Sequence, residues 1–464
     1  MDKNLISKIP NMNSLLDHPM LTGTERERVK RAAQEFLDEL RRGILSGQFD
    51  NVPEHDECAR RILALVAEDR KPRLRSVINA TGVVLHTNLG RAPLGMDALQ
   101  SLTDVLCGYS NLEYDLETGQ RGSRYVHVED IICSLTGAQA AMVVNNNAAA
   151  IFLALAATAK GKRVAVSRGE LVEIGGSFRI PEIMENSGAE LIEVGTTNKT
   201  HLRDYEEAIA KKGAEIILKV HTSNYEIVGF TESVPIAELS QLGKRNGAPV
   251  LYDAGSCFLL DPQMLGLNVG ETAESAIKAG ADLVCFSGDK LIGSAQAGVV
   301  AGSAEIIAAM KKFPLARMVR PDKITLSVLE AALSLYCYPA EASQKIPTLA
   351  MLSMTPDTLR QNAETLAQRI RQVCPGWDID ICETEDETGG GSLPNVKLPG
   401  WSIRLCPDEI SVAQLEQLLR RGKDPVIIRI HDDKALISPR TLLHGEDDRL
   451  IEAIKEIIEN AVSR

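Results

Sequence analysis

Two residues suited to catalysis follow two apolar, strand-like runs of the sequence. Asp253 comes directly after the run 250–252, and Lys290 comes shortly after the run 283–286. About one strand–helix–strand unit separates them, so a parallel sheet would bring both to its carboxyl edge, where ligands bind. Pyridoxal 5′-phosphate (PLP) requires such a pair: the lysine forms a Schiff base, and the carboxylate keeps the pyridine nitrogen protonated. The lysine would also serve as the base that moves a substrate Cα proton.

A plainer interpretation of this pair is that Asp253 caps a helix and that Lys290 is a surface amine. Glycines near both residues favour the cofactor interpretation. Gly288 and Gly293 flank the lysine, and glycine frees the backbone to approach a ligand closely. We therefore expect a PLP site at this edge.

The phosphate group of such a cofactor needs backbone N–H groups at a helix N-terminus. Asn145, Asn146 and Asn147 stand between the strand-like run 141–144 and an alanine-rich stretch that predicts a helix. Phosphate binding and simple N-capping both fit these asparagines, and their place in the first half of the sheet favours phosphate binding. The nucleotide-binding motifs G-x-G-x-x-G and G-x-x-x-x-G-K-[ST] are absent from the sequence.

Further polar residues stand where they would reach the same edge. His221 ends a strand-like run, and both a place facing the cofactor ring and a loop hydrogen bond fit it. Ser287 follows the run that precedes Lys290 and is placed with the cofactor-binding residues. Arg91, Arg317 and Arg320 carry the guanidinium groups that bind phosphate-like anions, and solvated charges or ion pairs fit them equally.

Residues 78–305 contain the elements that must position these side chains. Short β-rich runs alternate there with helical stretches, which predicts a mostly parallel sheet with helices on both faces. The runs are 141–144, 164–166, 191–194, 216–220, 250–252, 283–286 and 299–301.

The two ends of the chain predict separate structures. The apolar spacing in the first 75 residues predicts helices. One of them is expected to run from a capping box at 24–27 to Gly47. The last 150 residues or so predict a smaller α/β unit with a helix at 358–373, a strand at 425–430 and a hairpin turn at 431–434. We expect three domains: a helical one at 1–72, a large α/β domain at 73–315 and a small α/β domain at 316–464.

The composition of the 464-residue chain excludes several classes of protein. No apolar run is long enough to span a bilayer, and the N-terminus lacks the pattern of a signal peptide. Nine cysteines without a C-x-x-C pair predict reduced thiols in the cytoplasm and no metal site. The net charge of −12 argues against a uniformly basic, nucleic-acid-binding surface. Residues 1–75 hold 14 basic and 13 acidic side chains, however, so the acidic excess belongs to the remainder.

Long motifs in this order resemble those of the bacterial selenocysteine synthases, the L-seryl-tRNA(Sec) selenium transferases. The matching segments are 77–91, 144–150, 167–176, 193–198, 219–225, 286–291 and 391–394. The resemblance runs from about residue 75 to the C-terminus, and the helical first segment has the family's length and placement. One departure lies at 293–296, where Gly-Ser-Ala-Gln replaces the more usual Gly-Gly-Pro-Gln.

The resemblance implies a fold-type I PLP enzyme in which Lys290 carries the cofactor and Asp253 pairs with its ring nitrogen. Such an enzyme eliminates water from seryl-tRNA(Sec) to give an aminoacrylyl intermediate, and selenium from selenophosphate then gives selenocysteinyl-tRNA(Sec). The resemblance also implies that Arg91, Arg317 and Arg320 hold the selenium donor and that the N-terminal helices contact the tRNA. Family members form rings of dimers, commonly decamers.

Two rival interpretations remain open from the sequence. One is a related PLP-dependent lyase that acts on a free, phosphorylated amino compound, although such relatives lack a helical N-terminal domain. The other is a PLP-free RNA-binding or scaffold protein that has kept the fold, against which the intact Asp253 and Lys290 argue.

Overall fold

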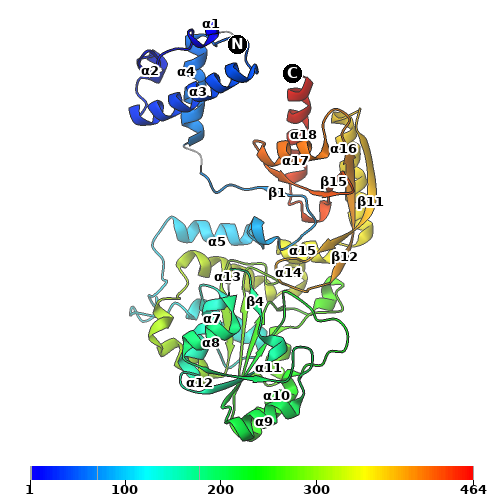
Figure 1. Cartoon of the computed structure of the whole chain (residues 1–464). Coiled ribbons are helices and arrows are strands. Elements are labelled where there is room, and N and C mark those ends of the chain that lie inside the picture. Colours follow the sequence, from blue (N-terminus) through cyan, green and yellow to red (C-terminus); the bar gives the residue numbers. More distant parts are fainter. Residues whose placement is uncertain (1–2, 70–71, 177, 463–464) are drawn as a thin grey trace. The chain divides into compact units, whose positions relative to one another are not determined.

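The computed structural model describes residues 3–69, 72–176 and 178–462 (Figure 1). It divides into two units, Met1–Ser76 and Val77–Arg464. Among the described residues, no helix is both long and apolar enough to cross a membrane. All nine cysteines are free thiols.

The first unit is helical, as its apolar spacing predicts. It contains α1 (Lys3–Ile6), α2 (Met12–Leu16), the 3-10 turn η1 (Pro19–Leu21), α3 (Arg26–Ser46) and α4 (His55–Asp69). Apolar faces of α3 and α4 pack together through buried residues such as Phe36 and Ile62. Gly47 ends α3 in the left-handed conformation, at a φ of 76°. The predicted capping box is wrong: α3 begins at Arg26 with Glu25 as an N-cap that makes no side-chain hydrogen bond, so Thr24 lies one residue too early.

The predicted large sheet is present with seven strands in the order β2-β10-β9-β8-β7-β3-β6. These are β2 (Ala140–Val144), β3 (Arg163–Ser167), β6 (Glu190–Val194), β7 (Ile216–Val220), β8 (Val250–Gly255), β9 (Leu283–Ser287) and β10 (Gly298–Gly302). All neighbours are parallel except β10, which is antiparallel to β2 and β9. The sheet is therefore mostly parallel, as predicted.

Helices bury both faces of this sheet, which explains why its strands are apolar nearly throughout. One face packs against α7 (Asn147–Thr158), α8 (Ile180–Ser187) and α12 (Ala304–Lys312), which Figure 1 shows grouped together. The other face packs against α6 (Val126–Thr136), α10 (Ile236–Asn246), α11 (Ala273–Lys278) and α13 (Lys323–Tyr336). The side chain of Leu251 in β8 lies on the face of the sheet that α7 covers. Side chains two residues apart in a strand lie on the same face, so Asp253 belongs to that face as well.

The second sheet has four strands in the order β11-β12-β15-β14. They are β11 (Asp378–Glu387), β12 (Lys397–Cys406), β14 (Arg429–His431) and β15 (Lys434–Ile437), with α16 (Pro356–Val373), α17 (Val412–Arg421) and α18 (Glu446–Val462) nearby. The predicted hairpin turn is confirmed: Asp432 and Asp433 both have positive φ, 50° and 55°, as a type I′ turn requires.

The single strand predicted at 425–430 is wrong. The chain there forms two short strands, β13 (Val426–Ile427) and β14, with different partners. β13 pairs in parallel with β1 (Ile78–Asn79), whereas β14 pairs with β15. The change of partner falls at Ile428, whose buried side chain joins the core of this region. A continuous apolar run does not reveal such a change of partner.

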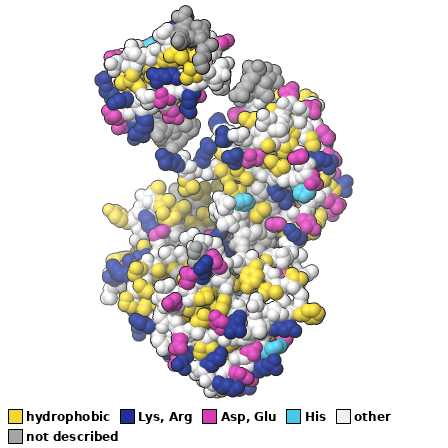
Figure 2. All heavy atoms as spheres, viewed as in Figure 1, with side chains coloured by type: hydrophobic (Ala, Val, Ile, Leu, Met, Phe, Trp, Pro, Cys, Tyr) yellow, Lys and Arg dark blue, Asp and Glu magenta, His cyan; other side chains and the backbone are white. Residues whose placement is uncertain are grey.

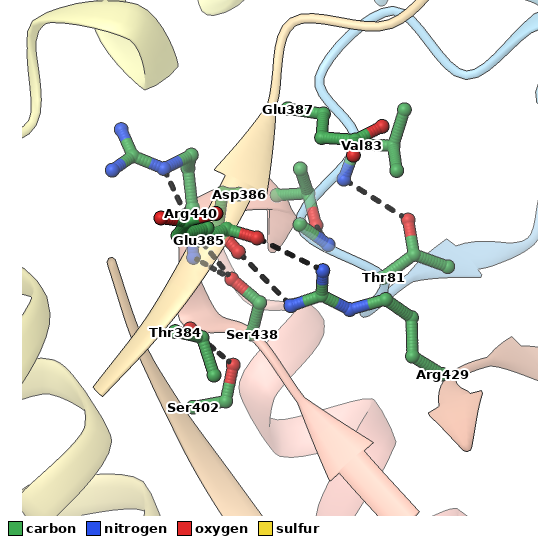
Figure 3. A network of polar contacts seen from close by, with 12 residues as sticks. Thr81, Val83, Thr384, Glu385, Asp386, Glu387, Ser402, Arg429, Ser438 and Arg440 are labelled. Carbon is green, nitrogen blue, oxygen red and sulfur yellow. Dashed lines mark hydrogen bonds and ion pairs between the residues drawn. The ribbon is translucent and has the colours of Figure 1, made fainter. Parts of the chain in front are cut away.

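A buried ionic network fixes the end of β11 (Figure 3). Asp386, which is fully buried, accepts hydrogen bonds from Nε of Arg440 at 2.9 Å, Nη2 of Arg429 at 3.2 Å and Oγ of Ser438 at 3.1 Å. Arg440 is also buried and donates to the carbonyl of Met351 at 2.8 Å. Burial raises the pKa of Asp386, and the two guanidinium groups oppose that shift.

Replacing Asp386 with Ala is expected to destabilise this region by about 3–5 kcal/mol, because Arg440 would remain buried without its counter-ion. The measurement is urea unfolding followed by tryptophan fluorescence, since the only two tryptophans, Trp377 and Trp401, lie beside β11 and in β12. The matched control is Asp380→Ala in the same strand, whose exposed pair with Arg404 should contribute less than about 1 kcal/mol. Equal effects of the two substitutions would contradict the prediction.

Candidate active site

Asp253 lies in β8 and makes no ion pair with the part of the chain that the structure describes. Its side chain is 2% exposed. Its Oδ1 accepts hydrogen bonds from Nδ2 of Asn147 at 2.8 Å and from the N–H of Gly255 at 3.1 Å, and Sγ of Cys285 lies 3.8 Å away. These partners within the described chain are uncharged, and burial raises the pKa of Asp253. A protonated ring nitrogen is the kind of cationic donor that this carboxylate lacks.

Lys290 lies in the turn after β9 and is also buried, at 5% exposure. Burial and the nearby Arg91 lower the pKa of its amine, while Asp253 and Asp289 oppose the shift. A lowered pKa increases the neutral fraction, which is the nucleophilic form that bonds to a carbonyl cofactor. Asp253 and Lys290 are therefore close enough to influence each other, as their sequence positions predicted.

The loop around Lys290 closes on itself in spite of the unusual residues 293–296. The N–H of Gly288 donates to the carbonyl of Ala297 at 2.9 Å, and the N–H of Ser294 donates to the carbonyl of Gly288 at 2.9 Å. Gly293 has a φ of 70°, which an L side chain adopts only with strain. Ser294 is buried and lies within hydrogen-bond distance of the carbonyl of Val328, at 3.4 Å. This sequence thus accommodates a well-bonded turn.

The three asparagines at the start of α7 have three different environments. Asn145 donates its N–H to the carbonyl of Val319 at 2.9 Å. Asn146 is the N-cap of α7, and its Oδ1 accepts the N–H of Ala149 at 2.8 Å. Asn147 reaches Asp253, and its own Oδ1 is buried without a hydrogen-bond partner in the described chain. Only Asn147 therefore joins the Asp253 cluster through its side chain.

His221 and Ser287 lie at the ends of neighbouring elements of the same edge. The N–H of His221, just after β7, donates to the carbonyl of Asp253 at 2.8 Å. Burial lowers the pKa of His221, with a further contribution from Lys219, which favours a neutral imidazole. Ser287 is the buried last residue of β9 and pairs with Gly298 of β10.

The predicted arginines fall into separate environments. Nη1 of Arg91 lies 2.7 Å from Oδ2 of Asp289, and Arg91 has a positive φ of 63°, a conformation that costs energy for a non-glycine residue. Nη1 of Arg320 lies 3.1 Å from Oε1 of Glu113. Arg317 is exposed and makes no ion pair with the part of the chain that the structure describes.

Sequence reasoning missed several members of these networks. Glu113 is shared by Arg320 and Arg124, whose Nη2 lies 2.6 Å from Oε1 of Glu113. No spacing rule connects these residues, which are far apart in the sequence. Asp289, the partner of Arg91, was detectable only from its place directly before Lys290.

The residues present fit PLP. The buried Asp253 needs a cationic hydrogen-bond donor, Oδ1 of Asn147 is an unpaired acceptor beside it, and the Lys290 amine is buried with a lowered pKa. Among the described residues there is no cluster of three or more His, Cys, Asp or Glu side chains suited to a metal ion.

Comparisons with known proteins agree with this fold. The family described as "SelA: L-seryl-tRNA selenium transferase" matches residues 77–443. Two proteins named L-seryl-tRNA(Sec) selenium transferase, from Moorella thermoacetica and Carboxydothermus hydrogenoformans, are each 46% identical to this chain. The alignments cover 99% and 97% of this chain and 98% of each relative.

Among solved structures, a D-glucosaminate-6-phosphate ammonia-lyase shares the fold, with a TM-score of 0.56 and 22% identity over 84% of this chain and 97% of that one. The prediction of a fold-type I α/β architecture is confirmed. The extent of the sequence match decides the family. This chain belongs to the L-seryl-tRNA(Sec) selenium transferases.

Proposed function

We propose that this chain converts L-seryl-tRNA(Sec) to L-selenocysteinyl-tRNA(Sec), with selenophosphate as the selenium donor. Identity of 46% along nearly the whole chain to relatives of that name supports the reaction. The observation that carries the proposal is the buried pair of Asp253 and Lys290 at the carboxyl edge of the sheet.

The cofactor is pyridoxal 5′-phosphate, which when bound withdraws electrons from the Cα of the seryl group. Lys290 holds it, and the neutral amine that burial favours takes up the Cα proton. Asp253 keeps a proton on the ring nitrogen, and Asn147 orients Asp253. The seryl group would then lose its Cα proton and its Cβ hydroxyl together as water. Selenium would bond to Cβ as a proton returns to Cα, and hydrolysis of the Se–P bond would release phosphate.

The selenium donor is an anion, and guanidinium groups suit it. Arg317 is exposed and free of ion pairs within the described chain, so its guanidinium is available to a ligand. Arg91 and Arg320 already face carboxylates, which hold them in place until an anion binds.

Replacing Arg317 with Ala should raise the KM for selenophosphate about 10- to 100-fold, the range expected for a lost charge-assisted hydrogen bond. Steady-state kinetics with varied selenophosphate would measure it. Arg420→Ala on α17, an exposed arginine paired with Glu416 at 2.7 Å, is the matched control. An unchanged KM would exclude Arg317 from the donor site.

The remaining roles extend this proposal to partners and assembly. The domain at 1–72 binds the tRNA, the domain at 73–315 holds the cofactor, and the domain at 316–464 completes the site.

Exposed apolar side chains support assembly into a ring of dimers, as a homodecamer; among them are Met96 at 76%, Leu116 at 75% and Tyr109, which is fully exposed. An aminoacyl-tRNA substrate supports a place in the cytoplasm.

Basic and acidic side chains are interspersed on the face shown in Figure 2, which supports local rather than global attraction for tRNA.

The decisive experiment is an assay of the purified protein with seryl-tRNA(Sec) and selenophosphate. Selenocysteinyl-tRNA(Sec) is the expected product, detected after ester hydrolysis by the chemistry of the released amino acid. Release of ammonia from a free phosphorylated amino compound, with seryl-tRNA(Sec) unchanged, would instead establish the lyase alternative.

A further inference from the structure

A small cavity lies between Ser223, Asn224 and the segment 387–397. Its volume is about 210 Å³, and Gly389, Gly390 and Gly391 form part of its wall. A Cβ atom placed on Gly391 would lie 3.8 Å from Nζ of Lys290. Gly391 therefore lies both in the cavity wall and close to the reactive amine.

Three successive glycines in the cavity wall carry backbone N–H donors. Gly389, Gly390 and Gly391 have φ values of 72°, 61° and 69°, a left-handed run that only glycine adopts readily. Successive N–H groups in such turns form concave surfaces that bind oxygen atoms. Within the described chain, these three N–H groups donate to no acceptor.

Two hydroxyl groups in the cavity wall are buried and unpaired, which independently indicates a ligand. Ser223 and Thr388 are each 1% exposed, and both line the cavity. Neither Oγ of Ser223 nor Oγ1 of Thr388 has a hydrogen-bond partner in the described structure. A buried hydroxyl without a partner costs free energy, so two in one small cavity are expected to bind a common ligand.

The position of Thr388 is fixed by the surrounding fold. Its carbonyl accepts the N–H of Leu85 at 2.7 Å, and it follows the end of β11 by one residue. The Asp386 network of Figure 3 holds that end of the strand. The hydroxyl is therefore preorganised, as a binding group should be.

The charges of the cavity wall favour a neutral carbonyl oxygen over a carboxylate as the ligand group. Its single cation is Lys397, whose Nζ lies 2.7 Å from Oε1 of Glu387, so the wall offers no free positive charge. A carboxylate buried there would lack a counter-ion, whereas a neutral carbonyl needs only hydrogen-bond donors.

We propose that the ester carbonyl oxygen of the seryl group accepts hydrogen bonds from the hydroxyls of Ser223 and Thr388, its two lone pairs matching these two donors, and that the amides of Gly389–391 line the same site. This surface selects serine esterified to a ribose over free serine, whose carboxylate would be unpaired. The assignment rests on the proposed function, because it takes the seryl ester as the substrate.

The test compares two probes, L-serine methyl ester and free L-serine, by their effects on cofactor absorbance. The double variant Ser223→Ala, Thr388→Val should bind the ester about 10- to 100-fold more weakly than the wild type, since two neutral hydrogen bonds are lost. Its binding of free L-serine should stay within about twofold. Thr388→Ser, which keeps the hydroxyl, should retain the ester affinity.

Two matched controls separate this effect from a loss of fold. Ser240→Ala removes another buried, unpaired hydroxyl, on α10, and Thr384→Val makes the same change as Thr388→Val in β11 outside the cavity. Both should leave the ester affinity unchanged. Equal weakening of both probes, or no weakening of either, would overturn the assignment. Wild-type protein that binds the ester but leaves seryl-tRNA(Sec) unconverted would overturn the proposed function alone.

Discussion

Lys290→Ala protein is expected to purify colourless and to convert no seryl-tRNA(Sec), whereas the unsubstituted protein is yellow. The variant lacks the amine that holds the cofactor and moves the Cα proton, so we expect a loss of at least about 10³-fold in rate. Absorbance spectra measure the first effect, and the tRNA assay measures the second. Borohydride reduction of the wild type, followed by peptide mapping, should locate the cofactor on Lys290.

The control for this experiment is Lys278→Ala, an exposed lysine of α11 paired with Glu274 at 2.7 Å. It should remain yellow and active. A colourless wild-type protein would overturn the assignment of the cofactor site, and a cofactor fixed to another lysine would overturn the role of Lys290.

The pH dependence of cofactor attachment has a definite sign. Burial and Arg91 lower the pKa of the Lys290 amine, so the neutral, reactive form persists to lower pH than for a free lysine. Reconstitution of the cofactor-free protein should slow as the pH falls through that lowered pKa. Arg91→Ala removes a positive charge near the amine, which raises its pKa and should move the reconstitution profile to higher pH.

Much of the fold was predictable because burial on both faces leaves an apolar signature in each strand. The same rule located Asp253 and Lys290, since ligands bind beyond the carboxyl ends of parallel strands. The change of strand partner at Ile428 was not predictable from the sequence. β13 and β14 together form one apolar run and differ only in the strands with which they pair.

The remaining part of the site depends on contacts between distant segments. Glu113 meets Arg320 only in the folded chain, and Ser223 and Thr388 reach one cavity from loops that follow strands of two different sheets. Neither residue type stands out in a sequence, since serine and threonine are common in loops. What distinguishes these two is that their hydroxyl groups are buried and unpaired, which is a property of the fold.

Removal of residues 1–76 should abolish binding of tRNA(Sec) while leaving the yellow chromophore intact. The apolar core of the first unit draws on residues up to Val66, and the cores of the second unit begin at Ile78, so each unit has its own core. The site residues Asp253 and Lys290 belong to the second unit. We expect the affinity for tRNA(Sec) to fall at least about 100-fold, measured by filter binding, with the cofactor absorbance unchanged.

Charge explains why this binding must depend on local contacts. The first 75 residues are nearly neutral, and the remainder carries the acidic excess, so the truncated protein would repel a phosphate backbone. Binding by the whole protein should weaken as salt is added, because guanidinium–phosphate contacts release counter-ions. Arg41→Ala with Arg42→Ala, two exposed arginines of α3, tests this without truncation and should flatten the salt dependence. Truncated protein that binds tRNA(Sec) as tightly as the whole chain would show that the second unit contains the tRNA site.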